Sequence, residues 1–189
     1  MAEQRADSPG VAGLWLWRHP RAQGAAGRCI GRTDLPVDRR RAKRLAHRIR
    51  RTARQQGLPR VVWTSPLQRC ADVGRWLARW GWQHRTDARL LELDFGRWDG
   101  QPWTAIAHAD VAAWEADFAH HAPGGGEALA ALVARCRQFI AEQGGATPLL
   151  LVAHAGWMQA SGLGSADGLR ASAWPPAPRH GALLRRSGP

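Results

Sequence analysis

Leu14-Trp15-Leu16-Trp17-Arg18-His19 and Leu149-Leu150-Leu151-Val152-Ala153-His154 are two short apolar runs, each of which ends at a histidine. Both runs have the length of a β-strand, and a loop signal follows each of them: Pro20 after the first and Ala155-Gly156 after the second. In an open α/β sheet, ligands bind outside the carboxyl ends of the strands. The two runs therefore predict that two imidazoles lie at one crevice.

Strand-like and helix-like segments alternate along the chain around these two runs. We expect strands at residues 11–18, 61–64, 82–85, 148–153 and 181–184, and helices at 39–56, 66–80, 102–120, 127–143 and in part of 156–173. Asp38 is a plausible N-cap for the first helix, and Ser65 with Pro66 at the first helical position predicts the start of the second. The alternation predicts an α/β protein, a three-layer α/β/α sandwich with a mostly parallel sheet.

The size and composition of the chain fit one globular domain. Its 189 residues are 44% hydrophobic, and no apolar run approaches the roughly 20 residues that a membrane span needs. We expect residues 1–11 to be a flexible tail and 12–189 to be a single domain, and we expect a cytoplasmic location because no signal-like apolar segment is present. Cys29, Cys70 and Cys136 form no C-x-x-C pair, which favours reduced thiols and neither a disulfide framework nor a metal site.

The chain has a formal net charge of +12, for which two explanations compete. A basic surface can bind nucleic acid or a membrane, or the arginines can cover solvated helix faces. The basic residues are concentrated in 39–54, where apolar residues recur at helical spacing. This pattern favours an amphipathic helix with a charged outer face, so that nucleic acid and membranes are not the expected partners. The excess of positive charge still attracts an anionic substrate.

Two further residues carry chemistry at the expected strand ends. Arg69 lies in the first turns of the helix that follows strand 61–64, and both a helix N-terminus and a guanidinium suit a phosphate. Glu92 stands between Leu91 and Leu93, where burial would disfavour its charged form and let it donate a proton. The alternative for Glu92 is a helix-capping or ion-paired carboxylate.

A loop at residues 20–38 adds more positive charge close to His19. Its arginines, Arg21, Arg28 and Arg32, could each reach an anion at the strand ends, and their sequence context does not rank them. With Arg18, Arg69 and His154, a loop arginine makes a cationic pocket that fits a phosphoryl group. No acidic cluster for a hard cation is apparent in the sequence, so we expect His19 to act as the nucleophile without a metal or another cofactor.

Five segments, in this order, resemble the motifs of the histidine phosphatase superfamily, which has the phosphoglycerate-mutase-like fold. They are Leu16–Pro20 (the Arg-His-Gly signature, with Pro20 in place of glycine), Thr64–Cys70, Glu92–Gly100, Pro123–Glu127 and Val152–Gly156. The resemblance covers nearly the whole chain, from Leu14 to about Leu184. Pro20 fixes its own φ and removes an amide donor beside the nucleophile.

The resemblance implies a metal-independent phosphomonoester hydrolase that works in two steps. His19 forms a phosphohistidine, Glu92 first protonates the leaving oxygen and then activates water, and Arg18, Arg69 and His154 hold the phosphoryl oxygens. We take Arg28 as the loop arginine that binds phosphate. The partner is then a small phosphorylated metabolite, whereas the oligomeric state is left open.

Within the superfamily, Gly27–Pro36 and the short length resemble the α-ribazole-5′-phosphate phosphatase branch, which acts in cobalamin nucleotide-loop assembly. Two alternatives stay open. The first is a phosphatase or phosphoglycerate-mutase-type enzyme for another small metabolite. The second is a basic polyanion-binding module without catalysis, because of the charge at residues 39–54.

Overall fold

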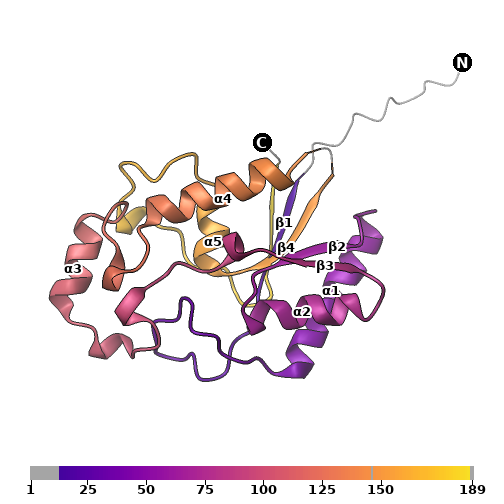
Figure 1. Ribbon diagram of the computed structural model, residues 1–189, viewed down its shortest axis with the longest axis horizontal. Coiled ribbons are helices and arrows are strands. Elements are labelled where there is room, and N and C mark those ends of the chain that lie inside the picture. Colours follow the sequence, from indigo (N-terminus) through magenta and orange to yellow (C-terminus); the bar gives the residue numbers. More distant parts are fainter. Residues whose placement is uncertain (1–12, 146, 188–189) are drawn as a thin grey trace, which may run out of the picture.

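A computed structural model describes residues 13–145 and 147–187, in which five strands form one sheet (Figure 1). The strands are β1 (Leu14–Arg18), β2 (Val61–Thr64), β3 (Gln83–Thr86), β4 (Leu149–Ala153) and β5 (Leu183–Arg186), in the order β3-β2-β4-β1-β5. All neighbours are parallel except β5, which pairs antiparallel with β1. The prediction of a mostly parallel sheet is confirmed, and the tail expected at residues 1–11 lies outside the described residues.

Helices cover both faces of the sheet because its central strands are buried on both sides (Figure 1). The apolar face of α1 (Arg39–Gln55) and of α2 (Gln68–Ala78) packs against Trp15, Trp17 and Val152. On the other face, α4 (Leu129–Gln143) and α5 (Ala155–Ala160) pack against Leu16 and Leu151. Successive side chains of a strand point to opposite faces, so each central strand contributes to both cores.

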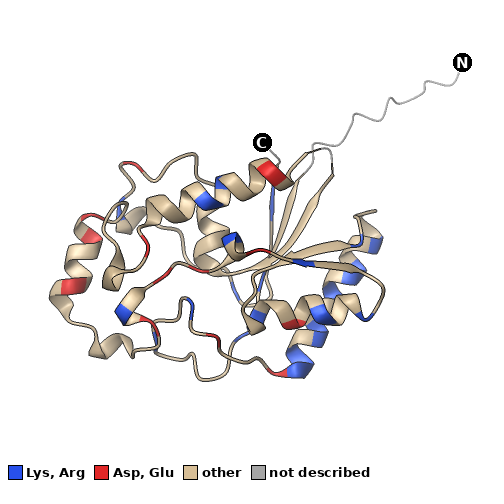
Figure 2. Ribbon diagram, viewed as in Figure 1, with Lys and Arg blue, Asp and Glu red and all other residues tan. Residues whose placement is uncertain are grey.

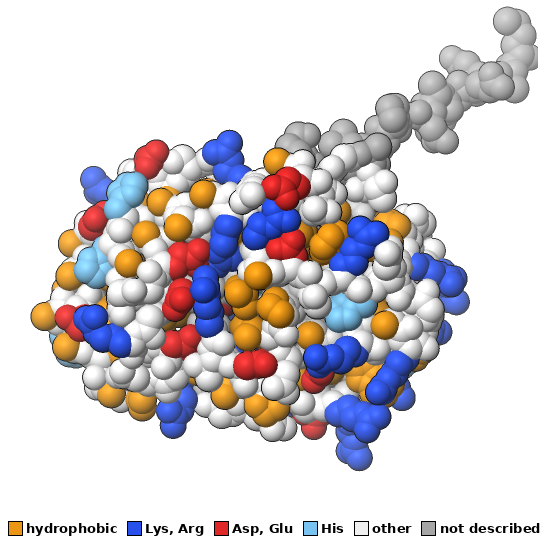
Figure 3. All heavy atoms as spheres, in the orientation of Figure 1, with side chains coloured by type: hydrophobic (Ala, Val, Ile, Leu, Met, Phe, Trp, Pro, Cys, Tyr) orange, Lys and Arg blue, Asp and Glu red, His pale blue; other side chains and the backbone are white. Residues whose placement is uncertain are grey.

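The exposed face of α1 carries the concentration of arginines that the sequence indicates (Figure 2). Part of this charge lies over tryptophans of α2 and of the turn after it: Lys43 is 5.1 Å from the Trp76 ring, and Arg50 is 5.2 Å from the Trp80 ring. Basic side chains accordingly gather over the α1 and α2 side of the molecule (Figure 3). Within the described residues, no helix combines the length and apolarity that crossing a membrane requires.

The starts of the first two helices differ in how they are capped. Asp38 caps α1 as predicted, because its side chain accepts a hydrogen bond from Arg41 N at 2.9 Å. The predicted start of α2 at Ser65-Pro66 is wrong, since this helix begins at Gln68 and receives no side-chain cap from the residue before it. Asp34, from the loop before α1, accepts the hydrogen bond from Gln68 N at 2.7 Å. A distant carboxylate therefore replaces the local cap.

The single helix predicted at 102–120 is also wrong. A 3₁₀ turn at Trp103–Ala105 precedes the shorter helix α3 (His108–Ala116). The backbone at 101–103 is engaged elsewhere: Cys29 N donates to Gln101 O at 2.8 Å, and Trp103 N donates to Gly27 O at 3.0 Å. These bonds tie the segment to the loop that follows β1, and the extended backbone at Ile106 (ψ 129°) and Ala107 (ψ 134°) separates the 3₁₀ turn from α3.

Two glycine-containing turns, at residues 95–96 and 123–126, pack closely against each other and form an interlock. Gly124 has a φ of +61°, and a Cβ there would collide with the carbonyl oxygen of Phe95. Gly125 has a similar φ of +74°, but the nearest atom to its Cβ would be Arg97 Nη1 at 3.8 Å. Both residues adopt a left-handed backbone, while only Gly124 also needs the absence of a side chain for packing.

We predict that Gly124→Ala destabilises the protein by several kcal/mol, whereas Gly125→Ala costs about 1–2 kcal/mol. The second value is the ordinary cost of a left-handed conformation for a residue with a Cβ. The first adds a backbone collision that no rotamer relieves. Urea unfolding of the two variants measures the difference, and equal midpoints would show that the interlock does not contribute to stability.

Candidate active site

One cavity of about 730 Å³ lies outside the carboxyl ends of β1 and β4. It is lined by the residues to which the sequence analysis assigns roles in catalysis or phosphate binding, namely Arg18, His19, Arg28, Arg69, Glu92 and His154. Four different segments of the chain deliver them: the end of β1 with the following loop, the start of α2, the segment after β3, and the end of β4. Parallel strands make this convergence possible because their carboxyl ends share one edge of the sheet.

His19 lines the cavity with only 7% of its surface exposed. Its Nδ1 lies 2.7 Å from the carbonyl oxygen of Pro20, which can only accept a hydrogen bond. Nδ1 therefore carries the hydrogen, and Nε2 keeps its lone pair. Burial, followed by the charge of Arg69, lowers the pKa of His19 well below 6.5, so the imidazole is neutral. A neutral imidazole with a fixed tautomer is the form that can act as a nucleophile.

Arg69 is almost fully buried, and the loop after β1 holds its guanidinium. It donates from Nη1 to Thr33 O at 2.7 Å, from Nη2 to Gly31 O at 2.5 Å, and from Nε to His154 Nδ1 at 3.3 Å. Two further N–H groups of the guanidinium have no hydrogen-bond partner within 13–145 and 147–187. The loop is held in turn by Asp99, which accepts hydrogen bonds from the backbone N–H groups of Gly31 and Thr33, both at 3.0 Å.

His154 is fully buried, and its ring centroid lies 5.0 Å from that of His19. Its Nδ1 accepts the hydrogen bond from Arg69, so Nε2 carries the hydrogen of the neutral ring and lies 3.5 Å from Cys70 Sγ. Burial is the main cause that lowers the pKa of His154 well below 6.5, and the charges of neighbouring cations add to it. In this arrangement His154 aligns Arg69 and contacts a weak sulfur partner.

Glu92 lies at the start of α5, where it also serves as a cap. Its carboxylate accepts hydrogen bonds from Gly156 N at 3.0 Å and Trp157 N at 3.2 Å, and from Leu93 N at 3.0 Å. Glu92 therefore caps a helix, as the alternative prediction from the sequence states. The same carboxylate also lines the cavity. Gly156 leaves the room for it, since a Cβ there would lie 2.5 Å from Glu92 Oε1.

The backbone of the Glu92 segment is held by an ion pair between Arg135 on α4 and Glu127 in the turn before that helix. Arg135 donates from Nη1 to Leu91 O at 2.7 Å and from Nη2 to Glu92 O at 3.0 Å. Glu127 holds that guanidinium through Arg135 Nε at 2.7 Å. Glu127, from the glycine-rich turn of the fourth motif, is thus a support of the Glu92 segment and does not line the cavity.

The remaining arginines divide into two groups. Arg18 lines the cavity, and its Nη1 donates to Pro178 O at 2.5 Å. Arg21 and Arg28 also line it, with Arg28 Nη1 held by Gly100 O at 2.8 Å. Arg32 does not, because it pairs with Asp94 at 3.2 Å and with Glu127 at 3.6 Å.

Sequence reasoning missed two features of the cavity. The first is His180, whose ring centroid lies 5.4 Å from that of His19. The second is a wall of aromatic side chains in the same cavity, formed by Phe95, Trp103, Trp114, Phe118 and Trp174. The spacing of these aromatic residues along the sequence gives no local signal that they share one surface.

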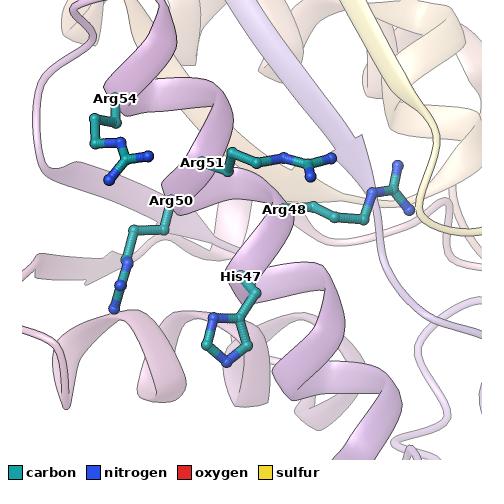
Figure 4. Close-up of a pocket in the computed structure, with 5 residues that line it drawn as sticks. All are labelled: His47, Arg48, Arg50, Arg51 and Arg54. Carbon is teal, nitrogen blue, oxygen red and sulfur yellow. The ribbon is translucent and has the colours of Figure 1, made fainter.

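Two other observations bear on where ligands can bind. A second depression of about 310 Å³ on α1, lined by His47, Arg48, Arg50, Arg51 and Arg54, contains none of the candidate residues (Figure 4). Among residues 13–145 and 147–187, no group of three or more His, Cys, Asp or Glu side chains is placed to hold a metal ion. The three cysteines are buried and free.

Comparison with solved structures finds proteins of the same architecture, among them a phosphatase. Mycobacterial glucosyl-3-phosphoglycerate phosphatase is 28% identical, with a TM-score of 0.73 and coverage of 92% of this chain and 89% of that one. A complex of the same enzyme with VO3 is 27% identical, with a TM-score of 0.74 and 92% coverage of both chains. The protein TTHB049 of Thermus thermophilus is 29% identical over 78% of this chain and 81% of that one, with a TM-score of 0.60. No curated protein matches the chain.

The model of the histidine phosphatase superfamily (branch 1) matches residues 14–178, which is most of the chain. The α/β fold and the hydrolase class expected from the sequence are thereby confirmed. This protein is a phosphatase, and the chain belongs to branch 1 of the histidine phosphatase superfamily.

Proposed function

We propose that this phosphatase hydrolyses small phosphomonoesters through a phosphohistidine on His19. The observation that carries the proposal is the neutral His19 imidazole, whose Nδ1 is fixed by Pro20 O and whose ring faces a cavity lined by Arg18 and Arg69. A neutral nucleophile does not repel the anionic phosphoryl group, and the fixed cations around it attract that group. Arginine N–H groups neutralise the phosphoryl oxygens as charge develops on them.

The first step transfers the phosphoryl group to the protein. His19 Nε2 forms a bond to phosphorus while the bond from phosphorus to the ester oxygen breaks, and Glu92 supplies the proton that this oxygen takes up. Arg18, Arg28 and the two free N–H groups of Arg69 bind the phosphoryl oxygens. His154 aligns Arg69, and its Nε2–H is a further donor, because the sulfur that it contacts is a weak acceptor.

The second step releases phosphate. A water oxygen bonds to phosphorus, its proton passes to Glu92, and the bond between nitrogen and phosphorus breaks, so that the lone pair returns to His19 Nε2. Glu92 ends the cycle with the proton that it lost in the first step. The Glu92 carboxylate accepts hydrogen bonds from the backbone N–H groups of Gly156 and Trp157 at the start of α5. These bonds hold the carboxylate in place through both steps.

We further propose α-ribazole-5′-phosphate as the substrate, in cobalamin nucleotide-loop assembly. The resemblance of Gly27–Pro36 supports this choice, and so does the aromatic wall, since a flat aromatic base packs well against tryptophan and phenylalanine rings. The solved phosphatases favour a second candidate, a phosphorylated sugar or glycerate ester, because one of them acts on glucosyl-3-phosphoglycerate. Relative kcat/KM on α-ribazole phosphate, glucosyl-3-phosphoglycerate, 3-phosphoglycerate and p-nitrophenyl phosphate decides between the candidates.

The covalent step is tested by trapping. Quenching the enzyme during turnover of a ³²P-labelled monoester should leave an acid-labile, base-stable label. His19→Ala should abolish the label and reduce kcat by about 10³-fold or more, because the nucleophile is lost. His47→Ala, on the exposed face of α1, should keep both the label and the turnover. Label that persists in His19→Ala, or activity that EDTA removes and Mg²⁺ restores, would contradict the mechanism.

The position of Glu92 is tested through Gly156. In Gly156→Ala the new Cβ meets Glu92 Oε1, so the carboxylate must move, and we expect kcat to fall by about 10²-fold. The loss should be larger for an alkyl phosphate than for p-nitrophenyl phosphate, whose leaving group needs little protonation. Gly164→Ala, which adds a Cβ in open space, is the matched control. Equal losses on both substrates would argue against an acid role for Glu92.

Buried neutral histidines also make stability depend on pH. The pKa values of His19 and His154 are lowered on folding, so below about pH 6.5 the unfolded chain binds protons that the folded chain does not. Their contribution to stability is therefore nearly complete at pH 7.5 and is lost on acidification, by up to about 1.4 kcal/mol per histidine at pH 5.5. Urea unfolding at pH 7.5 and 5.5 should show a smaller loss in the His19→Gln/His154→Gln double variant than in the wild type.

A further inference from the structure

His180 lies in the turn that precedes β5, and it faces the same cavity as His19. The two rings are tilted by 51° with centroids 5.4 Å apart, and His180 Nδ1 lies 3.3 Å from the carbonyl oxygen of His19. None of the sequence motifs includes this histidine. It therefore adds a third imidazole beside His19 and His154.

The turn that carries His180 is fastened to the end of β1. Arg18 Nη1 donates to Pro178 O, Gly181 N donates to Arg18 O at 2.9 Å, and Arg18 N donates to Ala182 O at 3.0 Å. Arg48 approaches from α1, and its Nη2 donates to Gly181 O at 2.8 Å. In Figure 4, Arg48 extends from α1 toward this C-terminal segment. Position 180 is thus held in place before any ligand arrives.

Hydrogen bonding assigns the tautomer of His180. The carbonyl oxygen of His19 can only accept, so Nδ1 of His180 carries the hydrogen in the neutral ring. Nε2 is then the atom left to meet a ligand, since no hydrogen-bond partner for it exists in the described part of the chain.

The charges around His180 suit the arrival of an anion. Burial lowers its pKa, as do Arg18 on β1, Arg21 in the following loop and Arg41 on α1, whereas the bond to His19 O acts in the opposite direction. A phosphoryl dianion beside Arg18 offsets this positive charge, so that His180 can take up a proton from solvent as the anion binds. Nε2–H then donates a charge-assisted hydrogen bond.

We propose that His180 is a third active-site imidazole, whose Nε2 binds the phosphoryl group of the substrate. This inference rests on the proposed phosphomonoesterase function of the same cavity. The competing role is purely structural, in which Nδ1 of His180 holds the His19 carbonyl and nothing more. The two roles use different ring nitrogens and can therefore be separated by substitution.

Substituting His180 by asparagine or by glutamine tests the roles of its two ring nitrogens separately. An asparagine amide can replace Nδ1 as the donor to His19 O, while a glutamine amide reaches the position of Nε2. We expect His180→Ala and His180→Asn to raise the competitive Ki of inorganic phosphate about tenfold, with a matching rise in KM for p-nitrophenyl phosphate. His180→Gln should recover most of the affinity, and Arg179→Ala, an exposed neighbour in the same turn, should match the wild type.

Two outcomes would overturn the inference. One is a wild-type Ki in His180→Asn combined with a raised Ki in His180→Gln, which would assign only the structural role. The other is an unchanged Ki in all three variants. Phosphate affinity measured by calorimetry gives the same comparison without turnover, so a wild-type protein that binds phosphate but hydrolyses no monoester would count against the proposed function and not against His180.

Discussion

The parallel pairing of β1 with β4 is the constraint on which the cavity depends. Arg18 lies opposite Ala153, and the ladder continues for one more step, in which His19 N donates to Ala153 O at 3.0 Å. Both strands therefore end at the same level, and their next residues, His19 and His154, stand side by side. A slip of one residue would turn the alternating side chains of β1 to the wrong core, so the burial of Trp17 and Leu16 on opposite faces also maintains the site.

Hydrogen bonds from loops and helices hold the charged groups of the site that do not lie at a strand end. Asp99 fixes the loop at residues 31–33, the carbonyl groups of that loop hold Arg69, and His154 accepts a further hydrogen bond from Arg69. On the opposite side, Glu127 holds Arg135, which in turn holds the backbone of Glu92. Each buried cation thus has an acceptor before any substrate is present, which limits the cost of burying charge.

The elements that the sequence predicts well are those with a strong local pattern. The strand at Val61–Thr64, the apolar spacing of α1 with its Asp38 cap, and the two histidine-terminated runs all carry their own signals. The errors arise where distant backbone intervenes. Asp34 caps α2 from the loop before α1, and hydrogen bonds to Gly27 and Cys29 tie the start of 102–120 to the loop after β1, while extended backbone at 106–107 interrupts the predicted helix. His180 follows a proline-rich run with no periodicity, so only the antiparallel return of β5 beside β1 brings it to the cavity.

The replacement of the expected glycine by Pro20 illustrates how the cavity keeps its chemistry with a different residue. Proline offers no backbone N–H, so the position cannot donate to an anion as a glycine amide could. Its carbonyl oxygen nevertheless accepts from His19 Nδ1 at 2.7 Å, which leaves Nε2 as the nucleophilic nitrogen. The cavity beside it is lined by Arg18, Arg21, Arg28 and Arg69, so positive charge is abundant without that donor. Among so many cations, the site also needs a neutral and oriented imidazole: burial lowers the pKa of His19 and keeps the ring neutral, while the Pro20 carbonyl orients it.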